Sequence, residues 1–243
     1  MLDVMPDLEF LLVAGLAAAL GAIVQSGIGL GLGLVAAPIV TLLFPSLMPG
    51  ALLIAATVLP LFVVAKEVRH ADWRGLRWAF GGRLAGTPFG VWFVALVPQR
   101  ALGTAVGGMV LLAIGLSLWS GRVPRNAGTL TGAGLLAGVM GTATSIGGPP
   151  IALIYQRESG PRIRATLSIF FTVGALLSVL TLAAVHQLPQ RQIWAGLALT
   201  PFVVAGFMVS GPFRRYLDRG RTRNAVLVLT GASAVILIVR SLL

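Results

Sequence analysis

Apolar residues fill nearly the whole chain, in runs longer than a soluble protein would carry. No ionisable residue occurs between Glu9 and Lys66, and further uncharged runs extend over 126–156, 165–185 and 192–213. About 20 apolar residues are enough for a helix to cross the hydrocarbon layer of a membrane, so each run can hold one or more crossings. The pattern predicts an all-α integral membrane protein.

Glycine, proline and charged positions divide these runs into about ten apolar segments. They are approximately 8–25, 28–46, 50–66, 75–97, 101–120, 127–143, 146–156, 163–186, 192–212 and 222–242. Segment 146–156 is short for a full crossing at about 1.5 Å per residue. It either crosses or forms a re-entrant half-helix.

The composition supports this class and excludes several others. The hydrophobic fraction is 57%, and only 10% of residues are charged, against roughly 25% in soluble domains. The net charge of +11 comes from basic residues in the short connections, which is the positive-inside pattern and requires no nucleic acid. Anionic membrane lipids account for it. Without cysteine, disulfides and thiolate metal sites are excluded, and we predict no metal site and no cofactor.

The charges also predict an orientation. With the acidic N-terminus outside, the inner connections are strongly basic and the outer ones are not, which is the expected bias. The inner connections hold Lys66, Arg69, Arg74, Arg77, Arg122, Arg125, Arg157, Arg162, Arg164, Arg214, Arg215, Arg219, Arg221 and Arg223. The outer ones hold Arg100, His186, Arg191 and Arg240.

The halves 1–121 and 122–243 resemble each other in the order of their features. Each has a helix ending in a glycine-rich break, a segment after prolines, a Trp-x-Gly turn and two further segments. With five segments per half, the second copy is inverted, and the charges agree: the turn at Trp73 is basic, whereas the turn at Trp194 is not. Inverted repeats are typical of secondary transporters. We expect one membrane domain built from two inverted five-segment repeats.

The two glycine-rich breaks are the candidate binding site. A glycine disfavours a helix by about 1 kcal/mol and an interior proline by about 3 kcal/mol, so we expect broken or half-helices there. Unwound backbone exposes amides that bind anions at helix N-termini, and paired breaks mark a midplane substrate site. The candidate residues are Gln25, Ser26, Gly29, Gly31 and Gly33 in the first break and Thr142, Thr144, Ser145, Gly147, Gly148 and Pro149 in the second. The alternative is close helix packing through small residues.

Arg83 is the candidate cation. It follows Arg77 by six residues in segment 75–97, which places it about 9 Å deeper in the membrane. Its guanidinium could bind an oxyanion through two hydrogen bonds. The alternative is that the side chain extends to the inner surface.

The chain resembles the TauE/SafE family of sulfite exporters. The resemblance rests on Gly29, Gly31, Gly33 and Pro38, on the Asp72-Trp73 turn followed by glycines over 82–90, and on the Ser-Ile-Gly-Gly-Pro-Pro stretch at 145–150. It implies a secondary transporter of small sulfur-containing anions, sulfite or organosulfonates such as sulfoacetate. It also implies that the protein lies in the bacterial inner membrane. The outer N-terminus that the charges predict would then be periplasmic. The double proline at 149–150 departs from the family pattern.

Two other functions are compatible with these sequence features. The same breaks could line a passive anion channel. An integral membrane enzyme has less support, because it needs a nucleophile with a base or a metal cluster at membrane depth, and we predict no catalytic residue. A coupling proton or sodium, the transport direction and the oligomeric state are not determined by the sequence.

Overall fold

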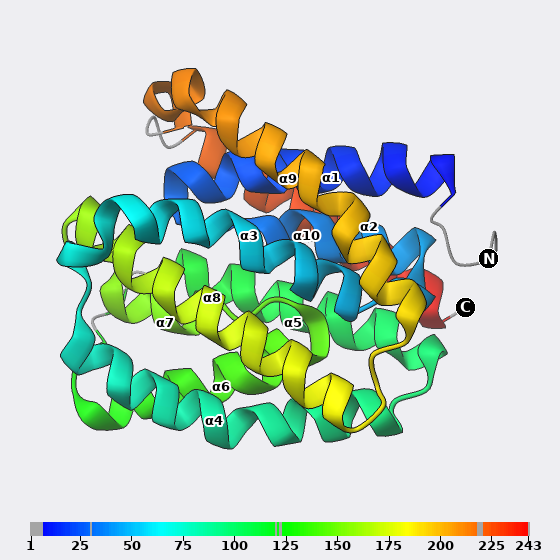
Figure 1. Cartoon of the computed structure of the whole chain (residues 1–243), viewed down its shortest axis with the longest axis horizontal. Coiled ribbons are helices and arrows are strands. Elements are labelled where there is room, and N and C mark those ends of the chain that lie inside the picture. Colours follow the sequence, from blue (N-terminus) through cyan, green and yellow to red (C-terminus); the bar gives the residue numbers. More distant parts are fainter. Residues whose placement is uncertain (1–6, 30, 120, 122, 218–220, 243) are drawn as a thin grey trace.

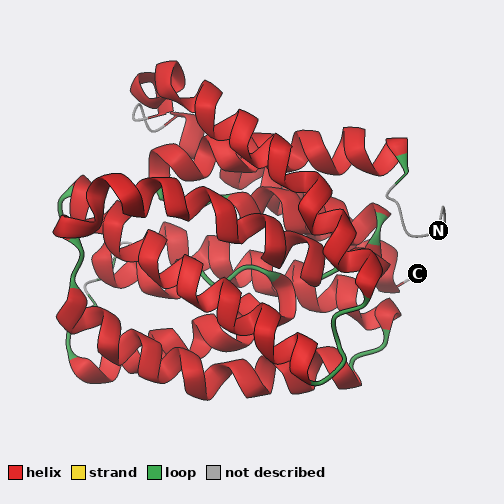
Figure 2. Cartoon of the chain, viewed as in Figure 1, coloured by secondary structure: helices red, strands yellow, loops and turns green. Residues whose placement is uncertain are grey.

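The computed structural model describes residues 7–29, 31–119, 121, 123–217 and 221–242, and the regular structure in these ranges is helical, with no strand (Figure 2). The prediction of an all-α fold is confirmed. The helices are α1 Leu8–Ile28, α2 Leu32–Leu43, α3 Gly50–Glu67, α4 Trp73–Leu96, α5 Gln99–Leu118, α6 Ala127–Thr144, α7 Pro149–Tyr155, α8 Gly160–Ala184, α9 Gln190–Leu217 and α10 Arg221–Leu242, with short 3₁₀ turns at Pro45–Leu47 and Val68–His70.

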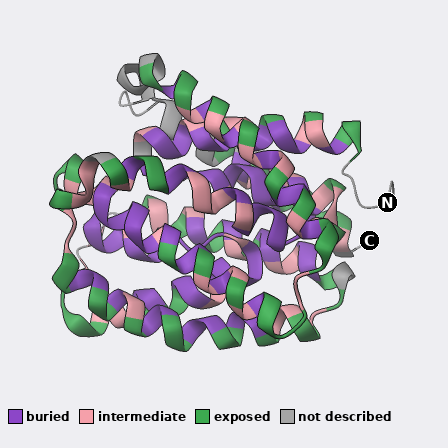
Figure 3. Ribbon diagram, in the orientation of Figure 1, coloured by how far each residue is buried: buried purple, intermediate pink, exposed green. Residues whose placement is uncertain are grey.

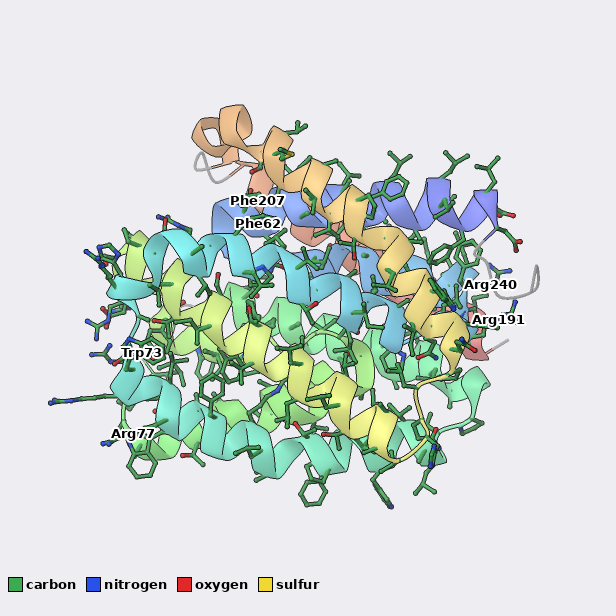
Figure 4. The ribbon with its side chains drawn as sticks, in the orientation of Figure 1. Phe62, Trp73, Arg77, Arg191, Phe207 and Arg240 are labelled. Carbon is green, nitrogen blue, oxygen red and sulfur yellow. The ribbon has the colours of Figure 1, made fainter. Side chains whose placement is uncertain are left out.

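The helices run back and forth along the long axis of the molecule (Figure 1). The α3–α4, α5–α6 and α7–α8 connections lie at one end, and the α2–α3, α4–α5 and α8–α9 connections lie at the other. Trp73 and Arg77 mark the first, which we call the basic end, and Arg191 and Arg240 mark the opposite end (Figure 4). Connections that the charges assign to one side of a membrane therefore lie together.

Four helices among the described residues are long and apolar enough to cross a membrane. Their apolar parts are Leu8–Gly27, Ala101–Leu118, Gly160–Ala184 and Gln190–Gly211. In contrast, α7 has 7 residues and rises only about 10 Å. The short seventh segment is therefore a half-helix, one of the two forms the sequence allows.

The second segment is also shorter than its expected range of 28–46. Helix α2 has 12 residues, because the backbone around Gly29 and Gly31 leaves the helix and Phe44 ends it. The φ angle of Gly29 is 88°, a left-handed conformation that glycine adopts without a steric penalty.

Helix pairing brings distant parts of the chain together. The most extensive contacts join α4 to α6, α1 to α9, α3 to α8 and α5 to α10. Backbones approach closely where glycines lie: a Cβ atom at Gly86 or Gly134 would meet the carbonyl oxygen of Leu135 or Ala79, respectively. Between α3 and α9 the rings of Phe62 and Phe207 stack at 5.4 Å (Figure 4).

Buried residues lie toward the middle of the helix bundle, and exposed residues lie along its outer faces (Figure 3). Many of the exposed residues are large and apolar. Leu84, Phe89 and Trp92 of α4, for example, are exposed, as expected for a helix that faces lipid. One buried cluster includes Leu32 and Ile146, and a second packs around α4, α6 and α8. The candidate site lies between these two clusters.

Candidate functional site

The first break is held together by one glutamine. The amide of Gly29 donates to the carbonyl oxygen of Gln25 at 2.7 Å, which ends α1. The amide of Leu32, at the start of α2, donates to the side-chain oxygen of Gln25 at 3.0 Å. Gln25 therefore stabilises both sides of the break with neutral groups.

The second break contains a strained residue. Ser145 ends α6 with a φ angle of 63°. This left-handed conformation is energetically unfavourable for residues other than glycine. Its amide donates to the carbonyl oxygen of Gly141 at 3.0 Å, and its hydroxyl donates to that of Pro49 at 3.1 Å. The chain then continues through Ile146 to Gly148 before α7 begins. Backbone strain of this kind occurs most often at functional sites.

The two breaks meet around a cavity of about 60 Å³. They are in close contact, because a Cβ atom at Gly33 would collide with the carbonyl oxygen of Ser145. A space of this size, with Arg83 and Ser145 on its wall, can hold several water molecules and so a small anion. Of the candidate residues, Gln25, Gly31, Gly33, Arg83, Ser145, Gly147, Gly148 and Pro149 line the cavity.

Arg83 points into the protein rather than toward the inner surface. Its exposed fraction is 3%, so the surface alternative for this side chain is wrong. One terminal nitrogen, Nη1, donates to the carbonyl oxygen of Ala137 at 2.7 Å. The other, Nη2, donates to the carbonyl oxygen of Gly174 at 2.8 Å and to the hydroxyl of Ser178 at 3.0 Å. The guanidinium thus joins α4 to α6 and α8.

The hydrogen bonds of Arg83 leave its charge uncompensated. All three of these partners are neutral, and within the described part of the chain its Nε has no hydrogen-bond partner. Among the residues that the structure describes, no carboxylate forms an ion pair with it, and the sequence has no acidic residue from 73 to 157. The ring of Phe170 lies 5.5 Å from Cζ. A buried cation without a counter-charge is unfavourable by several kcal/mol, so the site favours an anion.

Three glycines enclose the guanidinium. A Cβ atom at Gly141, Gly147 or Gly174 would lie 2.6, 2.7 or 2.8 Å, respectively, from an atom of that group. Side chains larger than hydrogen would therefore displace Arg83. This fixes the cation beside the cavity.

Four candidate residues do not line the cavity. The hydroxyl of Ser26 donates to the carbonyl oxygen of Ile23 at 2.8 Å, and that of Thr144 to the carbonyl oxygen of Met140 at 2.8 Å. Gly29 ends α1 on the side of α8, where an added Cβ would lie 3.5 Å from Leu167. Thr142 forms a 2.7 Å hydrogen bond with Ser178, so it reaches Arg83 only through that hydroxyl.

None of the three hydrogen-bond partners of Arg83 was predicted from the sequence: they are Ala137, Gly174 and Ser178. Gly174 and Ser178 lie on α8 about 90 residues after Arg83, where a glycine and a serine in an apolar helix give no functional signal. Only the packing of α8 against α4 brings them to the guanidinium.

Comparison with known proteins agrees with this geometry. Broken helices around a cavity, within a bundle of apolar helices, are typical of secondary transporters. The family model described as sulfite exporter TauE/SafE matches residues 13–237, nearly the whole chain. The chain therefore belongs to the TauE/SafE family, a family of membrane transporters, and the predicted family is confirmed. No curated protein and no solved structure matches the chain.

Proposed function

We propose that the protein is a secondary transporter of small sulfur-containing anions, sulfite or organosulfonates such as sulfoacetate, that works by alternating access. The observation that carries this proposal is the burial of Arg83, without a carboxylate partner, beside a cavity between two broken helices. Family membership supports the sulfur-containing class of substrate.

The geometry supports recognition of a small oxyanion. A guanidinium forms strong charge-assisted hydrogen bonds to oxyanions, and none of the described residues accepts a hydrogen bond from the Nε of Arg83. Glycines at 31, 33 and 147 leave the backbone accessible from the cavity. The anion would supply the counter-charge that the described residues do not.

The helix pairing supports two inverted repeats, residues 1–121 and 122–243, within one membrane domain. Helix α1 packs along α9 as α6 packs along α4, and α2 meets α10 as α7 meets α5. When α1 to α5 are matched in order with α6 to α10, the α1–α9 pair corresponds to the α6–α4 pair. In the same way, the α2–α10 pair corresponds to the α7–α5 pair. With its basic end inside, the protein lies in the bacterial inner membrane with a periplasmic N-terminus.

Transport by proteoliposomes tests the proposal. The protein should take up labelled sulfite or sulfoacetate with saturation, and Arg83→Gln should lower uptake at least about thirtyfold, since it removes a buried charge from the site. Arg77→Gln is the matched control, because Arg77 lies on the same helix and is exposed. Undiminished uptake by Arg83→Gln, or no uptake of any sulfur oxyanion by the parent, would overturn the proposal.

A counterflow assay separates the carrier from a passive anion channel. Unlabelled anion inside the vesicles should accelerate the uptake of labelled anion from outside. In a carrier, a binding site that holds an anion reorients across the membrane faster than an empty site, whose buried charge lacks a partner. A channel would show no such acceleration.

A further inference from the structure

A cluster of charged side chains at the basic end is centred on Asp72, in the α3–α4 connection. Its carboxylate accepts hydrogen bonds from the hydroxyl of Tyr155 at 2.9 Å and from the amide of Gly75 at 3.2 Å. Burial raises the pKa of Asp72, but these two hydrogen bonds and nearby Arg125 and Arg162 outweigh it and hold the pKa below its usual value. The carboxylate is therefore ionised at neutral pH, and its hydrogen bonds are charge-assisted.

Ion pairs extend this cluster to further elements. Arg125, in the α5–α6 connection, lies 3.1 Å from Asp72 and 2.9 Å from Glu158. Arg162, at the start of α8, lies 3.6 Å from Asp72 and 3.5 Å from Glu158. The cluster thus joins the beginning of α4 to the end of α7 and the beginning of α8.

Two short helical stretches connect this cluster to the cavity. Helix α7 begins with Pro149, which lines the cavity, and ends with Tyr155, which donates to Asp72. Asp72 also caps the N-terminus of α4, and Arg83 follows it on that helix by about 16 Å. A Cβ atom at Gly75 would collide with the Tyr155 hydroxyl, so the glycine permits this contact.

We propose that the hydrogen bond between Tyr155 and Asp72 couples the cavity to closure of the basic end, and that Tyr155 is a positioning residue of the transport cycle. The inference rests on the proposed function. In the proposed cycle, the bond holds the end of α7 to the start of α4, and the cavity stays closed toward the basic end while the bond is formed. Opening toward that end requires the bond to break, after which Pro149 and Arg83 can separate.

The opposite end is held in a different way. There the side chain of Gln192 accepts from the amide of Gly50 at 3.0 Å and donates to the carbonyl oxygens of Ser46 and Met48 at 3.0 and 2.9 Å. These bonds join the start of α9 to the α2–α3 connection with neutral groups only. Changes to the Asp72 cluster should therefore alter access from the basic end alone.

A second ion pair at the basic end provides the matched control. Arg164 of α8 binds Glu67 of α3 with nitrogen–oxygen distances of 2.8 to 3.2 Å. Neither residue belongs to α4 or α7. Breaking this pair removes charge–charge contacts at the same end without touching the link from Tyr155 to Asp72.

Access to the cavity is measurable because the chain has no cysteine. Ala175→Cys places one thiol on the cavity wall, and a membrane-impermeant thiol reagent is applied to vesicles of each orientation. Adding Tyr155→Phe, which keeps the ring and its 5.9 Å contact with Arg125, should accelerate labelling from the basic end roughly tenfold, as expected for loss of a hydrogen bond to a charged group. Labelling from the opposite end should not change.

Two further variants support the interpretation. Asp72→Asn keeps a good helix cap but weakens the bond to Tyr155, so it should accelerate labelling in the same direction. Glu67→Gln should leave the labelling rate at the level of the parent. Equal rates in the Tyr155→Phe, Glu67→Gln and parent backgrounds would overturn the coupling.

Calorimetric titration with sulfite separates failure of the coupling from failure of the proposed function. The parent should bind sulfite, and Tyr155→Phe should bind it several-fold more weakly, because water that enters the opened cavity screens the charge of Arg83. Binding by the parent with an unchanged Kd in Tyr155→Phe would contradict the coupling alone. No binding by the parent would contradict the proposed function.

Discussion

The two helix breaks are both rich in glycine but differ in their chemistry. The first is stabilised by the carbonyl and the side chain of Gln25, both neutral. The second lies against Arg83 and contains Ser145 in a left-handed conformation. The fixed charge therefore lies beside only one of the two breaks. We expect the second break to determine anion affinity and the first to determine how well the cavity closes.

The largest effect should come from forcing the two breaks apart. In Gly33→Ala the new methyl group would meet the carbonyl oxygen of Ser145, a backbone atom that cannot move alone. We expect loss of sulfite uptake and a destabilisation of about 1–3 kcal/mol, typical of overpacking, measured as a lower unfolding temperature in detergent.

Gly115→Ala is the control for this experiment, because an added Cβ at Gly115 meets nothing within 4 Å. It should retain uptake and unfold at an equal or higher temperature, since alanine favours a helix over glycine. Normal uptake by Gly33→Ala would show that the breaks need not touch.

The second effect concerns the cation beside the second break. Gly174→Ala places a methyl group 2.8 Å from Cζ and Nε of Arg83, which should displace the guanidinium. We expect sulfite affinity to fall about tenfold or more, consistent with loss of a charged contact, in a calorimetric titration. Gly132→Ala, with open space around it, should leave the affinity unchanged; equal affinities in both variants would argue against a fixed position of Arg83.

A smaller effect should follow removal of one hydrogen bond to Arg83. Ser178→Ala leaves the guanidinium bound to the carbonyl oxygens of Ala137 and Gly174, so KM for sulfite should rise roughly three- to tenfold with little change in the maximal rate. Ser178→Thr should restore the KM, because it restores the hydroxyl. A lower maximal rate with an unchanged KM in Ser178→Ala would mean that Ser178 only supports the fold.

The smallest effect on affinity should come from the first break. Gln25→Leu removes the bond to the amide of Leu32 and leaves Arg83 untouched. We expect KM to change by less than about twofold, while the maximal rate falls because α2 is less well fixed. A large rise in KM would mean that Gln25 binds the anion directly, and the distinction between the two breaks would be wrong.

The sequence was most informative where the signal is local. The apolar runs predicted most helix ends to within a few residues, and the glycines predicted both breaks. It was less informative about hydroxyl groups. Ser26 and Thr144 bond to carbonyl oxygens three or four residues earlier in their own helices, a common alternative for serine and threonine that excludes them from the cavity.

The depth of Arg83 could not be decided from the sequence for a related reason. A long side chain in an apolar helix can extend to the surface or turn inward. Here carbonyl oxygens of α6 and α8 and three glycines from other parts of the chain accommodate it. These partners lie 54 to 95 residues away, so only the tertiary structure identifies them.

The location of a bound anion tests the central claim most directly. Selenite has the shape and charge of sulfite, and its selenium scatters X-rays anomalously. In crystals grown with selenite, the account predicts an anomalous peak in the cavity, within hydrogen-bonding reach of the Arg83 guanidinium and between Gly33 and Gly147. A peak confined to arginines of the basic end, with none in the cavity, would contradict it.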